Sequence, residues 1–468
     1  MKNMTLSLMA EAVGGELYIN GKKSENVRTE EECTSVVIDS RKAEQGSLFV
    51  ATVGERVDGH SYIAQVLEKG ALGVICEKKP EDWGCGPVEK ASYILVENSF
   101  TALKKLAKYY REQMKDVICV GIVGSVGKTS TKELVAAVLS QSFNTHKTQG
   151  NLNNEVGVPL TVLGIRDEHD AAVIEMGISD FNEMDRLGCI VKPDGVVMTN
   201  IGPCHLEKLG DLDGVLRAKS ECIKHIKENG FLAVNGDDAK LATVTDIGAR
   251  KLIRFGKNGS IFAENTVSRG LEGSDFTLCL SDTENGTVKR ECTIPLPGMH
   301  MVQNALAAAA VGRELGMSAD AIVKGVASVK PVSGRSNLIR TDRYLLVDDC
   351  YNANPKSMMA AIDLLKESAG RHCAILGDMF ELGENEKKLH AEVGAYAASQ
   401  GTDILVCIGA LSKNMFEAAD IESKFYFENV EGFNERINEI PFQTGDTILV
   451  KASHGMHLER IIEKFTEK

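Results

Sequence analysis

The segment from Gly121 to Ser130 constrains the fold of this chain more than any other stretch. It reads Gly-Ile-Val-Gly-Ser-Val-Gly-Lys-Thr-Ser, follows the apolar run 117–120 and precedes a helix-like stretch that ends near Phe143. A strand, a glycine loop and a helix in this order form a phosphate-binding loop, because small residues let backbone N–H groups approach phosphate oxygens. The sequence therefore predicts that the chain binds a nucleoside triphosphate.

Within this loop, Lys128 is expected to reach the terminal phosphates, and the hydroxyl of Thr129 can hold Mg²⁺. The loop is a tighter variant of the usual pattern, since Ile122 stands where the first glycine is expected. The predicted nucleotide contacts are Gly124, Ser125, Val126, Gly127, Lys128, Thr129 and Ser130. The alternative is a glycine-rich turn that binds nothing, and the flanking strand and helix argue against it.

Composition narrows the class of protein. Lys plus Arg total 53 and Asp plus Glu total 66, which gives a net charge of −13, without a basic run that could bind nucleic acid or an anionic membrane. Twelve cysteines stand singly between Cys33 and Cys407, which indicates reduced thiols rather than zinc ligands or disulfides. No apolar run approaches the roughly 18 residues of a membrane span. We expect a cytoplasmic monomer.

At 468 residues the chain is too long for one hydrophobic core, and its patterns predict an α/β protein of three domains. Residues 1–115 read as a small α/β domain with short strands and a helix near 62–69. In 116–331, apolar runs at 171–174, 195–198 and 231–234 alternate with helical patterns, which predicts a mostly parallel sheet that begins with the phosphate loop. A hinge is expected near 327–334.

The stretch 332–468 is predicted to form a Rossmann-like, doubly wound domain. The expected strands are 344–348, 372–376, 403–408, 424–427 and 446–450, and the expected helices are 356–368, 384–399, 411–419, 430–439 and 457–466. Ligands of such sheets bind beyond the carboxyl ends of the strands, which indicates residues 348–349, 377–378 and 451–454.

Two polar residues follow predicted central strands. Glu175 ends the run 171–174 and His205 comes after the strand at 195–199, so both belong at the sheet edge where the phosphate loop opens. A carboxylate and an imidazole beside a triphosphate are natural partners of Mg²⁺ and phosphate. Each could equally be a surface or capping residue.

Lys219 stands on the apolar face of a helix predicted over 213–227. Val215, Lys219, Cys222 and Ile226 are spaced at i, i+4, i+7 and i+11 and share that face. The side chain can extend along the helix to solvent, or burial can lower its pKa and leave an amine that CO₂ converts into a carbamate, an extra carboxylate for a metal.

The loop 348–355 joins a predicted strand to a helix that starts at Pro355. Asn352 and Asn354 flank one alanine there, which suits recognition of a small polar ligand. Asn and Asp are also favoured in such turns for capping alone, so both interpretations remain open.

Together these stretches resemble the Mur ligases, ATP-dependent amide-forming enzymes of peptidoglycan precursor synthesis. The matching residues are Asp39-Ser40-Arg41, Gly46, Leu48-Phe49 and Asp58-Gly59-His60; Gly124 to Ser130, Gly150-Asn151, Asn153-Asn154-Glu155, Glu175-Met176-Gly177, Asn200-Ile201-Gly202, His205-Leu206-Glu207, Ala218-Lys219, His300 and Asn304-Ala305; and Gly334-Arg335, Asp349 to Pro355, Ser357-Met358 and Leu376 to Gly383. The strings at 351–355 and 376–383 are specific to the member that adds D-alanyl-D-alanine to UDP-N-acetylmuramoyl-tripeptide.

The resemblance implies a role for each matching site residue. Lys128 and the loop amides would hold the ATP phosphates, Thr129 and Glu175 one Mg²⁺, and His205 with carbamylated Lys219 a second. Asn304, Arg335 and Asp349 would contact adenine and ribose. The implied substrate contacts are Asp39, Ser40 and Arg41 for the nucleotide sugar, and Asn352 and Asn354 for the dipeptide. Asn153 and Asn154 are further implied substrate contacts.

Two positions depart from the family pattern. Met301 stands where asparagine is frequent, and Lys451-Ala452-Ser453-His454 replaces a more usual Lys-Gly-Ser-Arg, so the sequence does not identify the role of His454. Neither the base that deprotonates the amine nor the third peptide residue can be identified from the sequence. The competing hypotheses are another Mur-type or folylpolyglutamate-type ligase, or a nucleotide-dependent switch protein; the latter needs a guanine-specific Asn-Lys-x-Asp, which the sequence does not contain.

Overall fold

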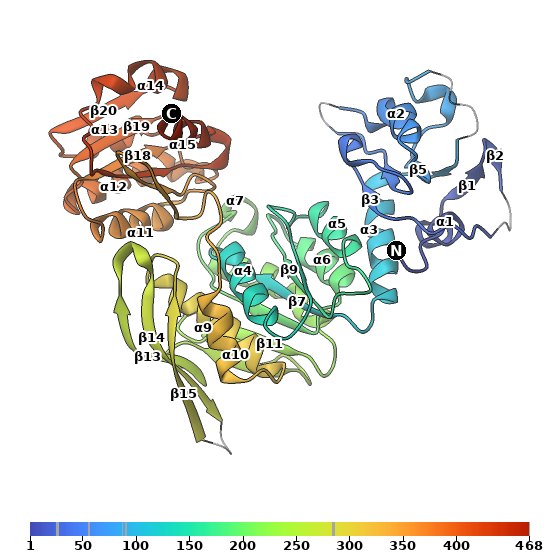
Figure 1. The fold of residues 1–468 in the computed structure, drawn as a ribbon, viewed down its shortest axis with the longest axis horizontal. Coiled ribbons are helices and arrows are strands. Elements are labelled where there is room, and N and C mark those ends of the chain that lie inside the picture. Colours follow the sequence, from blue (N-terminus) through green and yellow to red (C-terminus); the bar gives the residue numbers. More distant parts are fainter. Residues whose placement is uncertain (25–27, 55–56, 87, 89–90, 283–285, 468) are drawn as a thin grey trace.

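The structure is a computed structural model that describes residues 1–24, 28–54, 57–86, 88, 91–282 and 286–467. The described residues form three separate β-sheets, each accompanied by helices, so the predicted three-part α/β fold is confirmed (Figure 1). In Figure 1 the first unit lies at the upper right, the central unit below it and the third unit at the upper left. No helix among the described residues is long and apolar enough to cross a membrane.

The first sheet has the strand order β2-β1-β6-β5-β4-β3. Its strands are β1 Glu16–Ile19, β2 Lys22–Lys23, β3 Val36–Val37, β4 Leu48–Val50, β5 Gly73–Cys76 and β6 Tyr93–Leu95, and its helices are α1 Leu6–Val13, α2 Ile63–Glu68 and α3 Ser99–Gln113. Strands β3 to β6 are parallel, whereas β1 and β2 add antiparallel pairs at one edge.

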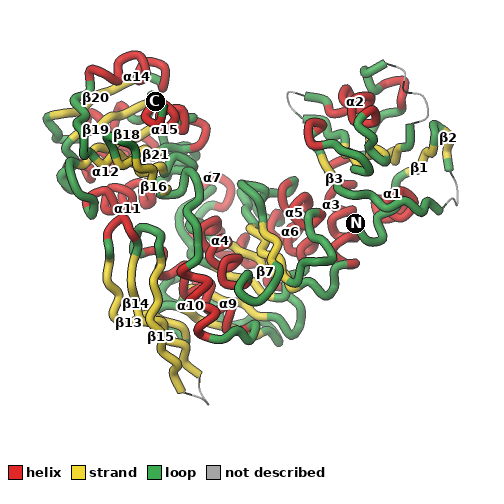
Figure 2. The backbone as a smooth tube through the Cα atoms, in the orientation of Figure 1, coloured by secondary structure: helices red, strands yellow, loops and turns green. Residues whose placement is uncertain are grey.

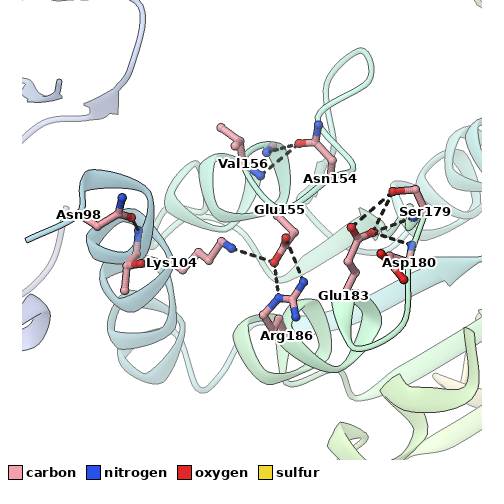
Figure 3. A network of polar contacts seen from close by, with 11 residues as sticks. Asn98, Lys104, Asn154, Glu155, Val156, Ser179, Asp180, Glu183 and Arg186 are labelled. Atoms are coloured by element: carbon pink, nitrogen blue, oxygen red, sulfur yellow. Dashed lines mark hydrogen bonds and ion pairs between the residues drawn. The ribbon is translucent and has the colours of Figure 1, made fainter. Parts of the chain in front are cut away.

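Helix α3 joins the first unit to the central one. Its buried residues Leu103, Leu106 and Tyr110 belong to one continuous hydrophobic cluster that extends from α1 to the helices of the central unit. Ion pairs support this junction, since Glu155 accepts from Lys104 Nζ on α3 at 2.8 Å and from Arg186 Nε at 2.5 Å (Figure 3). The shared core indicates that these two units are packed firmly together.

The central sheet has the order β15-β14-β13-β12-β11-β10-β7-β9-β8. Its strands are β7 Ile118–Val123, β8 Thr145–Lys147, β9 Ala171–Glu175, β10 Gly195–Met198, β11 Phe231–Asn235, β12 Lys251–Phe255, β13 Ile261–Ser268, β14 Ser274–Asp282 and β15 Gly286–Ile294. The helices are α4 Lys128–Leu139, α5 Gly157–Leu163, α6 Glu183–Val191, α7 Leu206–Leu209, α8 Leu212–Ser220, α9 His300–Glu314 and α10 Ala319–Ala327. Helices α4, α9 and α10 cover one face, and α5, α6 and α8 cover the other.

The sequence patterns did not anticipate the antiparallel extension of this sheet by β13, β14 and β15, which projects beyond the helices (Figure 2). The turn between β13 and β14 reaches the third unit. There Leu271 joins a buried cluster of third-unit side chains, and Ser268 Oγ donates to Glu367 Oε2 at 2.6 Å. The central and third units are therefore in contact at a second place besides the chain segment that links them.

The third sheet has the order β16-β17-β21-β18-β19-β20, parallel except for β16. Its strands are β16 Asn337–Arg340, β17 Leu345–Asp348, β18 His372–Gly377, β19 Ile404–Ile408, β20 Ser423–Phe427 and β21 Thr447–Lys451, and its helices are α11 Pro355–Lys366, α12 Glu386–Ser399, α13 Lys413–Ala418, α14 Val430–Arg436 and α15 Glu459–Thr466. Two hydrophobic clusters on opposite faces, one with α11 to α13 and one with α14 and α15, agree with the predicted double winding.

The helix predicted over 213–227 is shorter than expected. Helix α8 ends at Ser220, and a 3₁₀ turn follows over Glu221–His225. This turn packs closely on α6, where a Cβ added to Gly188 would lie 2.8 Å from the His225 ring. Val215, Lys219, Cys222 and Ile226 are nevertheless all buried, which confirms the predicted apolar face.

Candidate active site

The glycine loop between β7 and α4 adopts the predicted strand-loop-helix arrangement. Gly124 has φ of 157° and a Cβ there would lie 2.0 Å from Thr199 Oγ1, while Gly127 begins the helix at φ of 81°. Asn200, after β10, clamps the loop: its Oδ1 accepts from the Val126 N–H at 2.9 Å and its Nδ2 donates to the Val126 carbonyl at 2.9 Å. The loop is thus fixed at the carboxyl edge of the sheet, where small residues are required.

Lys128 is the first residue of α4 and turns back over the loop. Its Nζ donates to the carbonyl oxygens of Gly124 at 2.9 Å and Ser125 at 3.4 Å. Burial lowers the pKa of Lys128, and the nearby Glu175 carboxylate opposes that shift. The Lys128 ammonium is therefore held at the surface of the loop where the backbone N–H groups would bind the phosphates.

Glu175 ends β9 and is only 1% exposed. Its Oε1 accepts from Thr129 Oγ1 at 3.2 Å and from Asn153 Nδ2 at 2.8 Å, whereas Oε2 has no hydrogen-bond partner among the described residues. An unsatisfied buried carboxylate oxygen is costly, and a hard divalent cation would compensate it. The pair formed by Glu175 and the Thr129 hydroxyl therefore fits Mg²⁺.

Lys132 completes the surroundings of this carboxylate, and sequence reasoning gave it no role. Its buried Nζ donates to the Thr148 carbonyl at 2.8 Å and lies 4.0 Å from Glu175 Oε2. The sequence feature that could have identified Lys132 is its position one turn after Lys128 on the same face of α4. In the part of the chain that the structure describes, no group of three or more His, Cys, Asp or Glu side chains could hold a metal. A cation at Glu175 would therefore need further oxygen ligands from a nucleotide or from a modified side chain.

Lys219 is also 1% exposed, and within the described residues no carboxylate lies within 4.0 Å of its Nζ. Burial lowers the pKa of Lys219 to about 8, and the positive charge of Lys128 adds to this shift. A buried amine without a counter-charge is costly as an ammonium but is suited to reaction with CO₂.

His205 lies between the central and third units. It adopts a left-handed backbone conformation, with φ of 51°, and its Nδ1 lies 3.3 Å from Glu381 Oε2 of the third unit. Burial lowers the pKa of His205, as do Lys219 and Lys128, while Glu381 opposes them. These mutual effects indicate that His205, Lys219 and Lys128 occupy one region.

Arg335 brings the third unit to the loop. Its Nη2 donates to Thr129 Oγ1 at 3.2 Å, and its Cζ lies 4.1 Å from the centre of the Tyr351 ring. On the central side, Asn304 of α9 lies beside Gly127, since a Cβ added to that glycine would be 3.4 Å from Asn304 Oδ1. Asp349 accepts from Lys451 Nζ at 2.6 Å and from the Ser336 N–H at 3.0 Å. Arg335 and Asn304 thus approach the loop directly, whereas Asp349 follows the carboxyl end of β17 and its hydrogen bonds stay within the third unit.

The predicted substrate residues are spread over several elements. Asp39 and Arg41 form a paired contact at the 3₁₀ helix Ser40–Lys42 of the first unit, with Nη2 to Oδ2 at 2.8 Å, and hydrogen bonds from Arg41 lower the pKa of Asp39 to about 2. Asn153 lies in the candidate site, because its Nδ2 donates to Glu175 Oε1. Asn154 makes local contacts instead, since its Oδ1 accepts from the N–H groups of Val156 and Gly157 at the start of α5.

The two asparagines of the third unit also make local contacts. Asn354 Oδ1 accepts from the Ser357 N–H at 2.9 Å and caps α11, so the capping interpretation of this residue is confirmed for its oxygen. Asn352 Oδ1 accepts from the Ala353 N–H at 2.8 Å, and its carbonyl accepts from Lys451 Nζ at 2.9 Å. Only the amide N–H₂ groups of Asn352 and Asn354 remain as donors for a ligand.

A substitution at Glu175 tests the cation site. Glu175→Gln should lower turnover on the order of 10²-fold and raise the Mg²⁺ concentration needed for half-maximal rate, because the charge that faces the cation is lost. The melting temperature without ligands should change little, since Lys132, the cation 4.0 Å from Glu175 Oε2, keeps its ion pair with Glu133. Both are measured by Mg²⁺ titration of ATP turnover and by thermal unfolding. Glu314→Gln, at the end of α9 beside Lys251, is the matched control; an unchanged Mg²⁺ requirement in Glu175→Gln would exclude a cation there.

The fold and the loop define a class of protein: a P-loop nucleotide enzyme of three α/β units. Three family models match along the chain: "Mur ligase family, catalytic domain" over residues 32–111, "Mur ligase middle domain" over 122–312 and "Mur ligase, glutamate ligase domain" over 334–454. The chain is 37% identical, over 92% of its length and 93% of the relative's, to UDP-N-acetylmuramoyl-tripeptide–D-alanyl-D-alanine ligase of Bacillus subtilis (strain 168). It belongs to the Mur ligase family and, within it, to the group of these tripeptide–D-alanyl-D-alanine ligases.

Solved structures agree with this assignment. A crystal structure of MurF from Acinetobacter baumannii is 32% identical, with a TM-score of 0.86 and 99% of each chain covered. A structure of MurF ligase from Thermotoga maritima in complex with ADP is 29% identical, with a TM-score of 0.77, over 92% of this chain and 96% of that one. The family resemblance inferred from the sequence is therefore confirmed.

Proposed function

We propose that this chain is an ATP-dependent ligase that joins D-alanyl-D-alanine to UDP-N-acetylmuramoyl-tripeptide, giving the pentapeptide precursor, ADP and phosphate. The observation that carries the proposal is a complete phosphate loop, with Lys128 in place beside the buried Glu175, in a chain that matches ligases of this name over nearly its whole length. The activity belongs to the synthesis of peptidoglycan.

The reaction has two steps. A carboxylate oxygen of the tripeptide attacks the γ-phosphorus of ATP, and the bond from this phosphorus to the β-phosphate oxygen breaks. ADP is released, and the tripeptide carboxylate becomes an acyl phosphate. The amine of D-alanyl-D-alanine then attacks the acyl carbon, loses a proton and expels phosphate. Lys128 offsets charge on the transferring phosphoryl group, and the amides of Gly124 to Ser130 orient the phosphates.

The charges that meet in the first step also call for Mg²⁺. Thr129 and Glu175 would hold one ion, and His205 with a carbamate on Lys219 would hold a second. When bound, the ions supply positive charge that screens the approaching carboxylate from the phosphates. Two observations on the described residues support this assignment: Oε2 of Glu175 has no hydrogen-bond partner, and no carboxylate lies within 4.0 Å of Lys219 Nζ.

Each unit is assigned a ligand. We assign the nucleotide sugar to residues 1–115 through Asp39, Ser40 and Arg41, ATP to residues 116–331 with Asn304, and the dipeptide to residues 332–468 through Asn352 and Asn354. Arg335 and Asp349 contact the nucleotide from the third unit, and the Arg335 contact with Thr129 supports that role. Dependence on ATP makes the cytoplasm the expected location.

Substrate-dependent release of phosphate from ATP tests the proposed function. Release should require the UDP-N-acetylmuramoyl-tripeptide and D-alanyl-D-alanine together, and mass spectrometry should detect the pentapeptide. Release that instead follows a single amino acid or a folate would assign the chain to another amide ligase. Hydrolysis of GTP without an amide product would identify a nucleotide-dependent switch protein.

The placement of ligand contacts on three units predicts compaction. The bound substrates can react only when the units approach one another, so they should favour a more compact state. Small-angle scattering should show a smaller radius of gyration with a non-hydrolysable ATP analogue plus tripeptide substrate than with either alone. Because the first and central units share a core, the change should come from the third unit. An identical radius in all samples would contradict closure.

A further inference from the structure

The sequence does not identify the role of His454. In the structure its imidazole stacks on the ring of Tyr351, and Arg335 of the candidate active site contacts the same ring. His454 follows β21 and begins the 3₁₀ turn His454–Met456. The centres of the His454 and Tyr351 rings are 5.3 Å apart, with 27° between their planes. The Arg335 guanidinium carbon lies 4.1 Å from the centre of the same Tyr351 ring.

These contacts form a continuous path to the phosphate loop. Arg335 donates from Nη2 to Thr129 Oγ1 at 3.2 Å, and Thr129 is the hydroxyl residue next to Lys128. The Tyr351 backbone is also bonded to the residue before Arg335, because its N–H donates to the Gly334 carbonyl at 3.2 Å. A guanidinium is attracted to an aromatic face, so the orientation of the Tyr351 ring restricts the direction in which Arg335 points.

The segment that leads to His454 is held in place by contacts of Lys451 and Ser453. Lys451 Nζ, which is buried, donates to Asp349 Oδ2 at 2.6 Å. The Ser453 N–H donates to the Asp378 carbonyl at 3.0 Å, and Ser453 Oγ accepts from the Phe380 N–H at 2.9 Å. The exposed imidazole of His454 therefore projects from a fixed support, and Tyr351 is the ring on which it stacks.

We propose that His454 is a positioning residue for the nucleotide: its imidazole holds the Tyr351 ring, and that ring aims Arg335 at the phosphate loop. The proposal rests on the role assigned above to Arg335 in ATP binding.

The test measures KM for ATP and kcat, with the other substrates saturating, in five variants. His454→Ala should raise KM for ATP about threefold to tenfold, the value of an aromatic pair, and change kcat less. His454→Phe keeps the stacked ring and should stay within about twofold of the unaltered enzyme. Arg335→Ala should raise KM more, and the double variant Arg335→Ala/His454→Ala should match Arg335→Ala alone, because His454 acts through Arg335.

His372→Ala is the matched control, since His372 lies at the amino end of β18, whereas His454 follows the carboxyl end of the neighbouring parallel strand β21. If Arg335→Ala leaves KM for ATP unchanged, the assigned role of Arg335 is wrong, and so is the positioning role of His454 that depends on it. If Arg335→Ala raises KM but His454→Ala does not, or if the two effects are additive, His454 does not act through Arg335. A change confined to KM for D-alanyl-D-alanine would instead place His454 in direct contact with that substrate and would also overturn the proposal.

Discussion

Replacing Lys128 with alanine should reduce kcat for pentapeptide formation on the order of 10³-fold and leave the fold intact. The ammonium is the cation held on the phosphate loop, and it offsets charge during transfer of the phosphoryl group. Its hydrogen bonds among the described residues go to the carbonyl oxygens of Gly124 and Ser125, so its removal breaks no direct ion pair there. Phosphate release and pentapeptide formation measure the activity, and circular dichroism measures the fold.

Lys251→Ala is the matched control for this experiment. Lys251 lies at the amino end of β12, exposed and paired with Glu314, so its loss should leave the rate unchanged. Lys128→Arg keeps the charge but changes its geometry and should still be strongly impaired. Near-normal turnover in a folded Lys128→Ala protein would remove the loop lysine from the mechanism.

Lys219 should act as a carbamate rather than as a cation. Its neutral amine would attack CO₂, forming an N–C bond and releasing a proton, and the new carboxylate would face the metal region. Lys219→Ala should then lose activity on the order of 10²-fold and regain part of it with formate, which can occupy the vacated position. Lys219→Arg, which cannot be carbamylated, should be inactive with or without formate. Carbon-13 NMR with labelled bicarbonate should detect the carbamate directly.

The result that would contradict this assignment is equally specific. If Lys219→Arg preserves activity, if formate rescues nothing in Lys219→Ala and if no carbamate signal is found, Lys219 is an ordinary cation. The pKa of about 8 also sets a pH dependence: as pH falls below this value the amine is increasingly protonated, so carbamylation and activity should fall together. Lys227→Ala, an exposed lysine paired with Asp194, is the matched control.

Local patterns were sufficient wherever an element is long and half-buried. Apart from β16, which was not predicted, the strands and helices of the third unit lie within a few residues of their predicted bounds, because regular alternation of apolar runs specifies them. The periodicity around Lys219 likewise identified its burial, although part of the expected helix is a 3₁₀ turn. The phosphate loop was predicted from residue types alone, since its geometry requires glycine at Gly124 and Gly127.

Contacts between distant residues could not be predicted in this way. Strand β15 is exposed along most of its length, so it lacks the apolar alternation that identifies a strand, and its pairing with β14 depends on the sheet edge beside it. Arg335 meets Thr129 across 206 positions of sequence, and only the fold shows that contact. Lys132 was missed because a lysine on a helix usually faces solvent.

The turn between β13 and β14 has a mechanical consequence for the third unit. That unit is joined to the central one by the covalent segment that contains Arg335 and, separately, by Leu271, which is buried among side chains of the third unit. A movement that pulled Leu271 out of this cluster would expose apolar surface and cost free energy. A movement that keeps Leu271 buried avoids this cost. The contact at the β13–β14 turn therefore favours a rotation of the third unit against the central one over a complete separation of the two.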